Sequence, residues 1–268
     1  MSDPLRLHDD LPPPLEKLDE ASAGPDFPAE LDVTSRAWFA CGYRPGIAAY
    51  LNFFLLRDFI VLHDDAFPAR FARFRSMADS FYRTDLFIRD VTDSGPIPTG
   101  GISSSRVRLT LAGIMRRHAR ISIPAWMMSY FGFSLLEAVE KRVPMADRER
   151  QLHLAYMART YRIMGLRFSE HRDQMERFAR AAERAHAGAS PQLPRHARHI
   201  LLLGEMIGAP SAAEQLLPLL PDATREVFAP LHASVRPGPL ERAAARVAGR
   251  MLLRSALGSP RRAVPAWS

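Results

Sequence analysis

One histidine interrupts the apolar side of a predicted helix. In residues 103–121, side chains recur at intervals of three and four positions, and the series is Val107, Leu111, Ile114, His118 and Ile121. This spacing places them on one face of a helix, so we expect His118 to point into the core. A ring nitrogen there could ligate iron or another transition metal. Alternatively, His118 is an ordinary core residue hydrogen-bonded to a carbonyl, and periodicity alone leaves both interpretations open.

A Glu-x-x-His step suggests a second metal chemistry. Glu183 and His186 form such a step, which is typical of di-iron helical bundles, and Glu137 and Glu140 could supply further carboxylates. A di-iron site needs two such steps and two more glutamates on four helices, whereas this sequence has a single step. A non-haem di-iron oxygenase is therefore a third-ranked interpretation.

Other reactive side chains fit structural roles better. His196 and His199 have helical spacing but no evident third ligand, which favours a polar helix start. Cys41 is the only cysteine, so an internal disulfide, a cysteine-rich zinc site and an iron–sulfur cluster are excluded, and we expect a buried, inert thiol. The serines of residues 103–105 lack a Gly-x-Ser-x-Gly motif, which argues against a hydrolase.

Helices must position all of these residues. Valine and threonine are sparse and no Asn-Gly or Asp-Gly hairpin turn occurs, so the expected fold is all-α, a single multi-helix domain around a pocket. The sequence predicts an irregular, proline-rich N-terminal arm over residues 1–34, a helical domain over 35–235, and a basic helix and tail over 236–268. The predicted helices are 45–62, 67–93, 103–121, 124–142, 145–165, 170–188, 192–207, 211–219, 222–233 and 238–257.

Two of these helices offer further pocket residues. In residues 67–93, Thr84 falls within the apolar series of Met77, Phe81, Ile88 and Val91, so it should face inward. The helix after Pro124 begins with bulky apolar residues. A flat apolar ligand could rest against that wall, and so could an ordinary core. The wall consists of Trp126, Met127, Met128, Tyr130, Phe131 and Phe133.

Composition narrows the function classes. The 268 residues are 47% hydrophobic, which suits one large folded domain. The N-terminus shows no secretory leader, so we expect a cytoplasmic protein. The uncharged run over residues 45–56 is too short to span a bilayer. The formal charge is +7, but no RNP, zinc-finger or basic-zipper pattern accompanies it, and we expect no nucleic-acid partner.

The C-terminal helix is basic and amphipathic. Arg242, Arg246, Arg250 and Arg254 follow one another at intervals of four, and Leu240, Ala244, Val247 and Met251 line another face. Residues 238–257 could lie on an anionic membrane surface as a peripheral contact. A terminal helix docked on the core with solvated arginines is the simpler alternative.

The stretch from Arg116 to Leu166 resembles the central region of the MpaB and latex-clearing-protein (rubber oxygenase) family. In that family a helix ending in a His-Ala step precedes an Ile-Pro turn, an apolar helix, a Val-Pro break and a helix ending in Gly-Leu or Gly-Val. The matching features here are His118–Ala119, Ile123–Pro124, residues 125–142, Val143–Pro144 and Gly165–Leu166. Upstream, Arg83 and Thr84 resemble the family's basic-Thr step. The likeness covers roughly residues 35–230.

The resemblance implies a haem b protein. His118 would be the proximal iron ligand, and Thr84, Trp126, Met127 and Tyr130 would contribute to the cofactor pocket, with Arg83 and Thr84 near the reacting oxygen. The implied activity is oxygenation of an apolar small molecule using O2, with isoprenoid and aromatic compounds as the candidate substrates.

The sequence departs from the family at one informative position. Where relatives carry an arginine four residues before the threonine, this chain has Ser80, which supplies no positive charge. The alternative function is therefore a non-catalytic haem-binding or apolar-ligand-binding helical protein.

Overall fold

A computed structural model of the chain describes residues 3–16, 26–42, 44–56, 123–188, 191–206, 208 and 213–258, with side chains described as far as Met251. Within these residues every named element is a helix, and the single β-contact is an isolated bridge between Leu56 and Ala187. The predicted all-α fold class is confirmed. The elements are α1 (Pro4–Asp9), α2 (Phe27–Cys41), α3 (Arg44–Phe54), α8 (Ala125–Arg142), α9 (Asp147–Ile163), α10 (Arg172–His186), α11 (Leu193–Met206), α12 (Ala213–Leu216), the 3-10 helix η2 (Leu217–Leu219), α13 (Asp222–Phe228), α14 (His232–Val235) and α15 (Pro239–Gly258).

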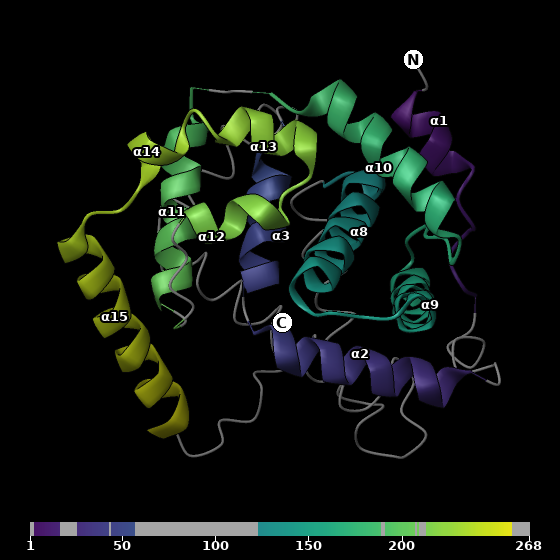
Figure 1. The fold of residues 1–268 in the computed structure, drawn as a ribbon, viewed down its shortest axis with the longest axis horizontal. Coiled ribbons are helices and arrows are strands. Elements are labelled where there is room, and N and C mark those ends of the chain that lie inside the picture. The colour runs from purple at the N-terminus through teal and green to yellow at the C-terminus, as the bar shows by residue number, and fades with distance from the viewer. Residues whose placement is uncertain are drawn as a thin grey trace.

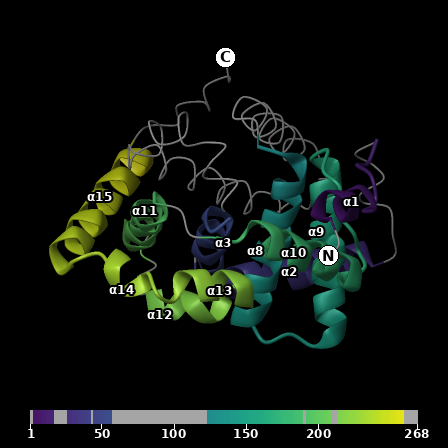
Figure 2. The same ribbon diagram turned by 90° about the horizontal axis from the view of Figure 1, so that it is seen from above.

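Helix α3 lies between two groups of helices (Figures 1 and 2). On one side it packs along α8, which also contacts α2, α9 and α10. On the other side α3 contacts α11, α12 and η2, while α15 covers α11 at the edge of the molecule. Because α3 is apolar on nearly all sides, it is stable only when other helices surround it.

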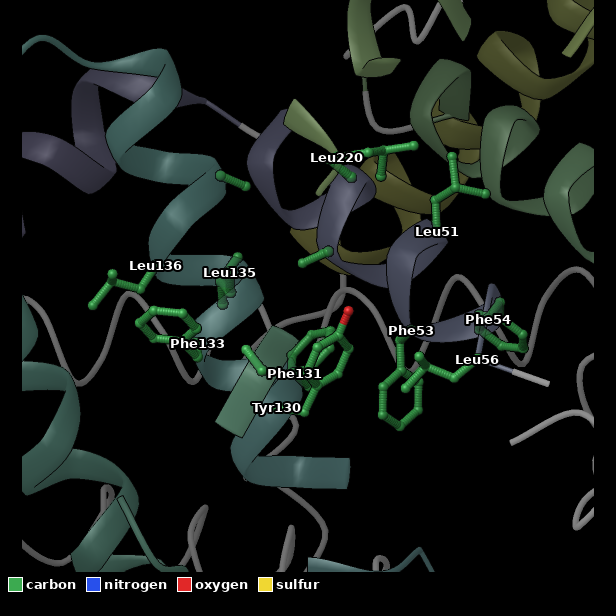
Figure 3. Packing of buried hydrophobic residues seen from close by; sticks show 14 of the residues in the cluster. Leu51, Phe53, Phe54, Leu56, Tyr130, Phe131, Phe133, Leu135, Leu136 and Leu220 are labelled. Carbon is green, nitrogen blue, oxygen red and sulfur yellow. The ribbon is translucent and has the colours of Figure 1, made fainter. Parts of the chain in front are cut away.

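Aromatic side chains fill the contact between α3 and α8. Phe131 meets Tyr50 and Phe53 edge to face, with ring centroids 5.2 and 5.6 Å apart. Figure 3 shows Phe53 and Phe131 in this contact, with Leu51 further along α3. Edge-to-face pairs add about 0.5–1.5 kcal/mol each to the stability that burial provides, so the contact holds the centre of the molecule together.

A glycine lets α8 and α9 approach closely. A Cβ at Gly132 of α8 would overlap the ring of Tyr161 on α9. Tyr161 is itself held against Phe168, with ring centroids 5.1 Å apart, and is buried. The ring therefore has little room to move away, and position 132 needs a residue without a side chain.

The predicted irregular arm over residues 1–34 contains two helices. The Asp3 carboxylate accepts a hydrogen bond from the Leu5 backbone N–H at 2.9 Å and caps α1. Pro4 and Pro28 lie in the first turns of α1 and α2, where proline's missing N–H costs no intrahelical bond. The prolines thus start helices here, and the prediction of irregular structure is wrong for residues 4–9 and 27–34.

Residues 3–16 form an N-terminal strap across α9, α10 and the turn between them. The ring of His8 lies 5.5 Å from that of Phe178 on α10, and its Nε2 is 3.2 Å from the Ser129 hydroxyl on α8. Backbone carbonyls of the strap accept further bonds. These are Arg167 Nη1 to Asp9 O (2.9 Å) and Leu11 O (2.8 Å), Arg162 Nε to Pro13 O (2.8 Å) and Phe168 N to Pro12 O (3.3 Å).

Most predicted helix boundaries in the described residues agree with the structure to within two or three positions. Two prolines account for the main exceptions. In the predicted helix 211–219, α12 ends at Leu216 and the 3-10 helix η2 begins at Leu217, directly before Pro218. The predicted helix 222–233 is divided at Pro230 into α13 and α14. The predicted helix 45–62 ends at Phe54, and the predicted helices 67–93 and 103–121 lie outside the described residues.

Candidate functional site

The predicted site residues divide between described and undescribed parts of the chain. His118, Arg83, Thr84 and Ser80 lie outside the described residues. Trp126, Met127 and Tyr130 lie in the first two turns of α8, and all three side chains are buried. The roles predicted for them stay predictions, but their neighbours are defined.

Trp126 joins the start of α8 to the end of α10. Its ring stacks on the imidazole of His186, with centroids 4.8 Å apart and planes 28° apart. Met127 is fully buried and belongs to the main hydrophobic core. The first turn of α8 is therefore apolar and enclosed, as the sequence predicts for this wall.

The hydroxyl of Tyr130 lies in a buried polar network. It accepts a hydrogen bond from Asn52 Nδ2 at 2.8 Å and donates one to Glu183 Oε1 at 3.2 Å. Asn52 Nδ2 also donates to the Ser134 hydroxyl at 2.6 Å. One tyrosine hydroxyl thereby connects α3, α8 and α10. Figure 3 shows Tyr130 next to Phe131 on α8, close to α3.

Arg180 closes the network on α10. Its Nη1 hydrogen-bonds both carboxylate oxygens of Glu183, at 2.7 and 2.8 Å, and its Nη2 hydrogen-bonds Glu137 of α8. The exposed fraction is 2% for the Glu183 side chain and 12% for that of Glu137. Buried carboxylates are stable only when they are paired, so Arg180 is the cation on which both depend.

Burial controls the ionisation of this network. Burial raises the pKa of Glu137 to about 6, although Arg180 opposes the shift. Burial likewise raises the pKa of Glu183, and burial together with the charge of Glu183 raises the pKa of Tyr130 well above its ordinary value. Burial lowers the pKa of Arg180, but the two carboxylates outweigh it and the net shift is upward. The guanidinium stays charged, while burial makes Glu137 easier to protonate than an exposed glutamate.

Glu140 belongs to a different cluster. Both its oxygens accept from Arg172 Nη2 at 2.7 Å, and its Oε1 lies 3.5 Å from Nδ1 of His153, a fully buried side chain on α9. Glu137 and Glu140, which the sequence suggested as joint metal ligands, therefore serve separate guanidinium groups.

The di-iron interpretation finds little support among the described side chains. Glu183 is bound by Arg180, and His186 stacks on Trp126. Within the described part of the chain, no three His, Cys, Asp or Glu side chains converge as metal ligands would. His196 stacks on Phe54, with centroids 5.5 Å apart, which fits the structural role expected for it.

Cys41 is buried, as expected, and its Sγ lies 3.2 Å from two backbone carbonyls, those of Trp38 and Gly42.

None of the described helices combines the length and apolarity needed to cross a bilayer.

Sequence reasoning missed the polar partners of Tyr130 and Glu183. Asn52 is the one amide in an otherwise uncharged, apolar run, which was a usable signal for a buried hydrogen-bonding role. Arg180 precedes Glu183 by one helical turn, a spacing typical of an intrahelical ion pair. The contacts of Asn52 and Glu183 with Tyr130 join three helices that are far apart in the sequence, which no local pattern reveals.

Comparison of the chain with protein-family models, with curated proteins and with solved structures found no match in any of the three.

Proposed function

We propose that this chain is a haem b-dependent oxygenase that acts on an apolar small molecule using O2. The proposal rests on the resemblance to the MpaB and latex-clearing-protein family over Arg116–Leu166. His118 is the proposed proximal ligand, and bound haem would supply oxygen binding and the oxidative chemistry.

The observation that carries the proposal is the agreement between helix boundaries and the family's pattern of breaks. Helix α8 begins directly after Pro124 and ends before Val143–Pro144. Helix α9 then runs to Ile163 and is followed by Gly165 at φ +81°, a left-handed conformation that favours glycine. Within residues 123–166, each break of the family motif thus coincides with a helix end in this chain.

The described residues also fit the chemistry of a porphyrin. The first turn of α8 follows His118 by only a few residues and presents buried apolar side chains, Trp126 and Met127, as the apolar faces of a haem require. The hydroxyl of Tyr130 is engaged by Asn52 and Glu183. Its contribution to a pocket would therefore come from the ring, and its hydroxyl would fix the position of α8.

The decisive experiment is spectroscopic. Full-length protein expressed with ample haem precursor should purify with a Soret band, and His118→Ala should abolish or greatly weaken that band while helical circular dichroism is kept. His171→Ala is the matched control, because His171 is exposed and makes no side-chain cap bond at the start of α10. A wild-type protein without Soret absorbance, or an unchanged band in His118→Ala, would refute haem ligation by His118.

Ser80, in place of the family's arginine, favours a second candidate, a haem protein without oxygenase activity. Reduced protein supplied with O2 and apolar isoprenoid or aromatic compounds should form oxidised products if it is an oxygenase. A Soret band without any product from these compounds would favour the second candidate. Iron in the purified protein without a Soret band would favour the di-iron interpretation.

A further inference from the structure

Helix α15 packs on α11 through its smallest residues. Ala245 and Gly249 are buried in this contact, and a Cβ at Gly249 would overlap the backbone carbonyl of Met206 on α11. The start of α15 is fixed by Glu241, which accepts hydrogen bonds from Arg198 of α11 and from the Gly238 backbone N–H. Among the described side chains, these contacts set the position of α15 without Leu240, Val247 or Met251.

Three larger apolar side chains of α15 face away from the protein. Leu240, Val247 and Met251 are 86%, 50% and 66% exposed. Their spacing of seven and four residues places them on one side of the helix, roughly opposite Gly249. Figures 1 and 2 show α15 at the edge of the molecule, with α11 on its inner side. From the sequence, this apolar row could dock on the core, but the structure leaves its three large side chains exposed.

A row of arginines borders the apolar row. Arg246 already forms an ion pair within the protein, because its Nε lies 2.9 Å from the buried carboxylate of Glu205. Arg250 is exposed and makes no ion pair with any described residue, and Arg254 follows it at the same interval. The one acidic residue of α15, Glu241, is already paired with Arg198. The outer surface of α15 is thus apolar along one line and cationic beside it.

We infer that the outer face of α15 binds an anionic lipid surface. Phosphate groups of the lipids would pair with Arg250, while Leu240, Val247 and Met251 enter the boundary between head groups and acyl chains. Charge complementarity selects this occupant. A second copy of the chain would bring another basic row to the same contact, whereas anionic lipid neutralises the row. The inference is independent of haem binding.

The test is cosedimentation of the full-length protein with two kinds of vesicle, phosphatidylcholine alone and an equal mixture of phosphatidylcholine and phosphatidylglycerol. We expect binding to the mixed vesicles at about 0.01 M salt and a marked loss near 0.1 M, where the Debye length falls to about 10 Å. Arg250→Gln should weaken binding about fivefold. The triple variant Leu240→Ser/Val247→Ser/Met251→Ser should weaken it by at least about tenfold.

Matched controls are available elsewhere on the surface. Arg177→Gln removes the same charge from an exposed side chain on α10, and Leu5→Ser removes an exposed apolar side chain from α1. Both should bind vesicles as the wild type does. No binding to mixed vesicles at low salt, or full binding by the triple variant, would overturn the inference. A concentration-dependent dimer that the triple variant abolishes, without vesicle binding, would show that the face joins two copies instead.

Discussion

A single guanidinium group, that of Arg180, hydrogen-bonds two carboxylates from different helices. Glu183 lies on the same helix and Glu137 on α8, and Tyr130 donates to Glu183 from the other side. The ion pairs do not simply add stability, because each buried carboxylate has lost its water. Instead, both carboxylates depend on one cation, because removal of Arg180 would leave two buried acids without their guanidinium partner.

Arg180→Met should therefore destabilise the protein by about 3 kcal/mol in the free energy of unfolding at neutral pH, measured by urea denaturation. The control is Arg177→Met on the same helix. Arg177 pairs with Asp173 at 2.9 Å, but both side chains are more than 60% exposed, so the expected cost is below about 0.5 kcal/mol. Equal effects of the two substitutions would contradict the role given to Arg180.

The pKa of Glu137 makes the stability depend on pH. Its folded-state pKa is raised to about 6 from an ordinary value of 4.5, so between these values the folded protein binds more protons than the unfolded chain. The contribution of Glu137 to the free energy of unfolding should therefore fall as pH rises through this window, by about 2 kcal/mol in total.

Glu137→Gln isolates this effect, because glutamine resembles the protonated acid. Urea denaturation of variant and wild type at about pH 4 and about pH 7 should show the variant gaining about 2 kcal/mol relative to the wild type at the higher pH. A difference in stability between the two proteins that is constant across pH would show that Glu137 titrates normally.

At the scale of helices, proline position explains both the successes and the failures of prediction. Proline ends or divides a helix at Pro218 and Pro230, yet it begins α1 and α2. Composition does not distinguish these cases, because the difference is whether the ring falls in the first turn or later. Long periodic helices such as α8 and α9 were predictable to within two residues, since burial of one face fixes their extent.

The contact between α8 and α9 depends on Gly132. In an exposed helix, Gly132→Ala would stabilise by about 1 kcal/mol. Here the new methyl group overlaps the ring of Tyr161, so we expect a net destabilisation of about 1–3 kcal/mol, measured by thermal or urea unfolding. Tyr161→Leu in the Gly132→Ala background should recover part of the loss. Strict additivity of the two substitutions would show that the methyl group is accommodated elsewhere.

In the candidate site, residue spacing predicts which side chains share a helix face but not which partners they meet. Glu137 and Glu183 were singled out together, and the structure does bring them together, although around a guanidinium group. Glu140 follows Glu137 by three residues, which turns it by about 60° from the same direction, towards His153 and Arg172. Spacing along one helix defines a face, but the partner opposite that face depends on how the helices pack.

At the scale of the whole molecule, α3 connects the two groups of helices. It packs on α8 on one side and on α11, α12 and η2 on the other. Asn52 lies on this helix, so the polar network of Tyr130 reaches the element that both groups share. The resulting fold joins residues about 50 from the N-terminus to helices from the second half of the chain, and such long-range contacts are expected to slow folding.

The N-terminal strap can dock only after residues far along the chain have been synthesised. His8 rests on Phe178, about 170 residues further along the chain, and the strap's carbonyls bind Arg162 and Arg167. At about 5–20 residues per second, a ribosome needs on the order of ten to thirty seconds to make the strap's docking site. The strap emerges before its docking site and is thus among the last of these segments to find its place, and until then it must stay clear of the helices that form between.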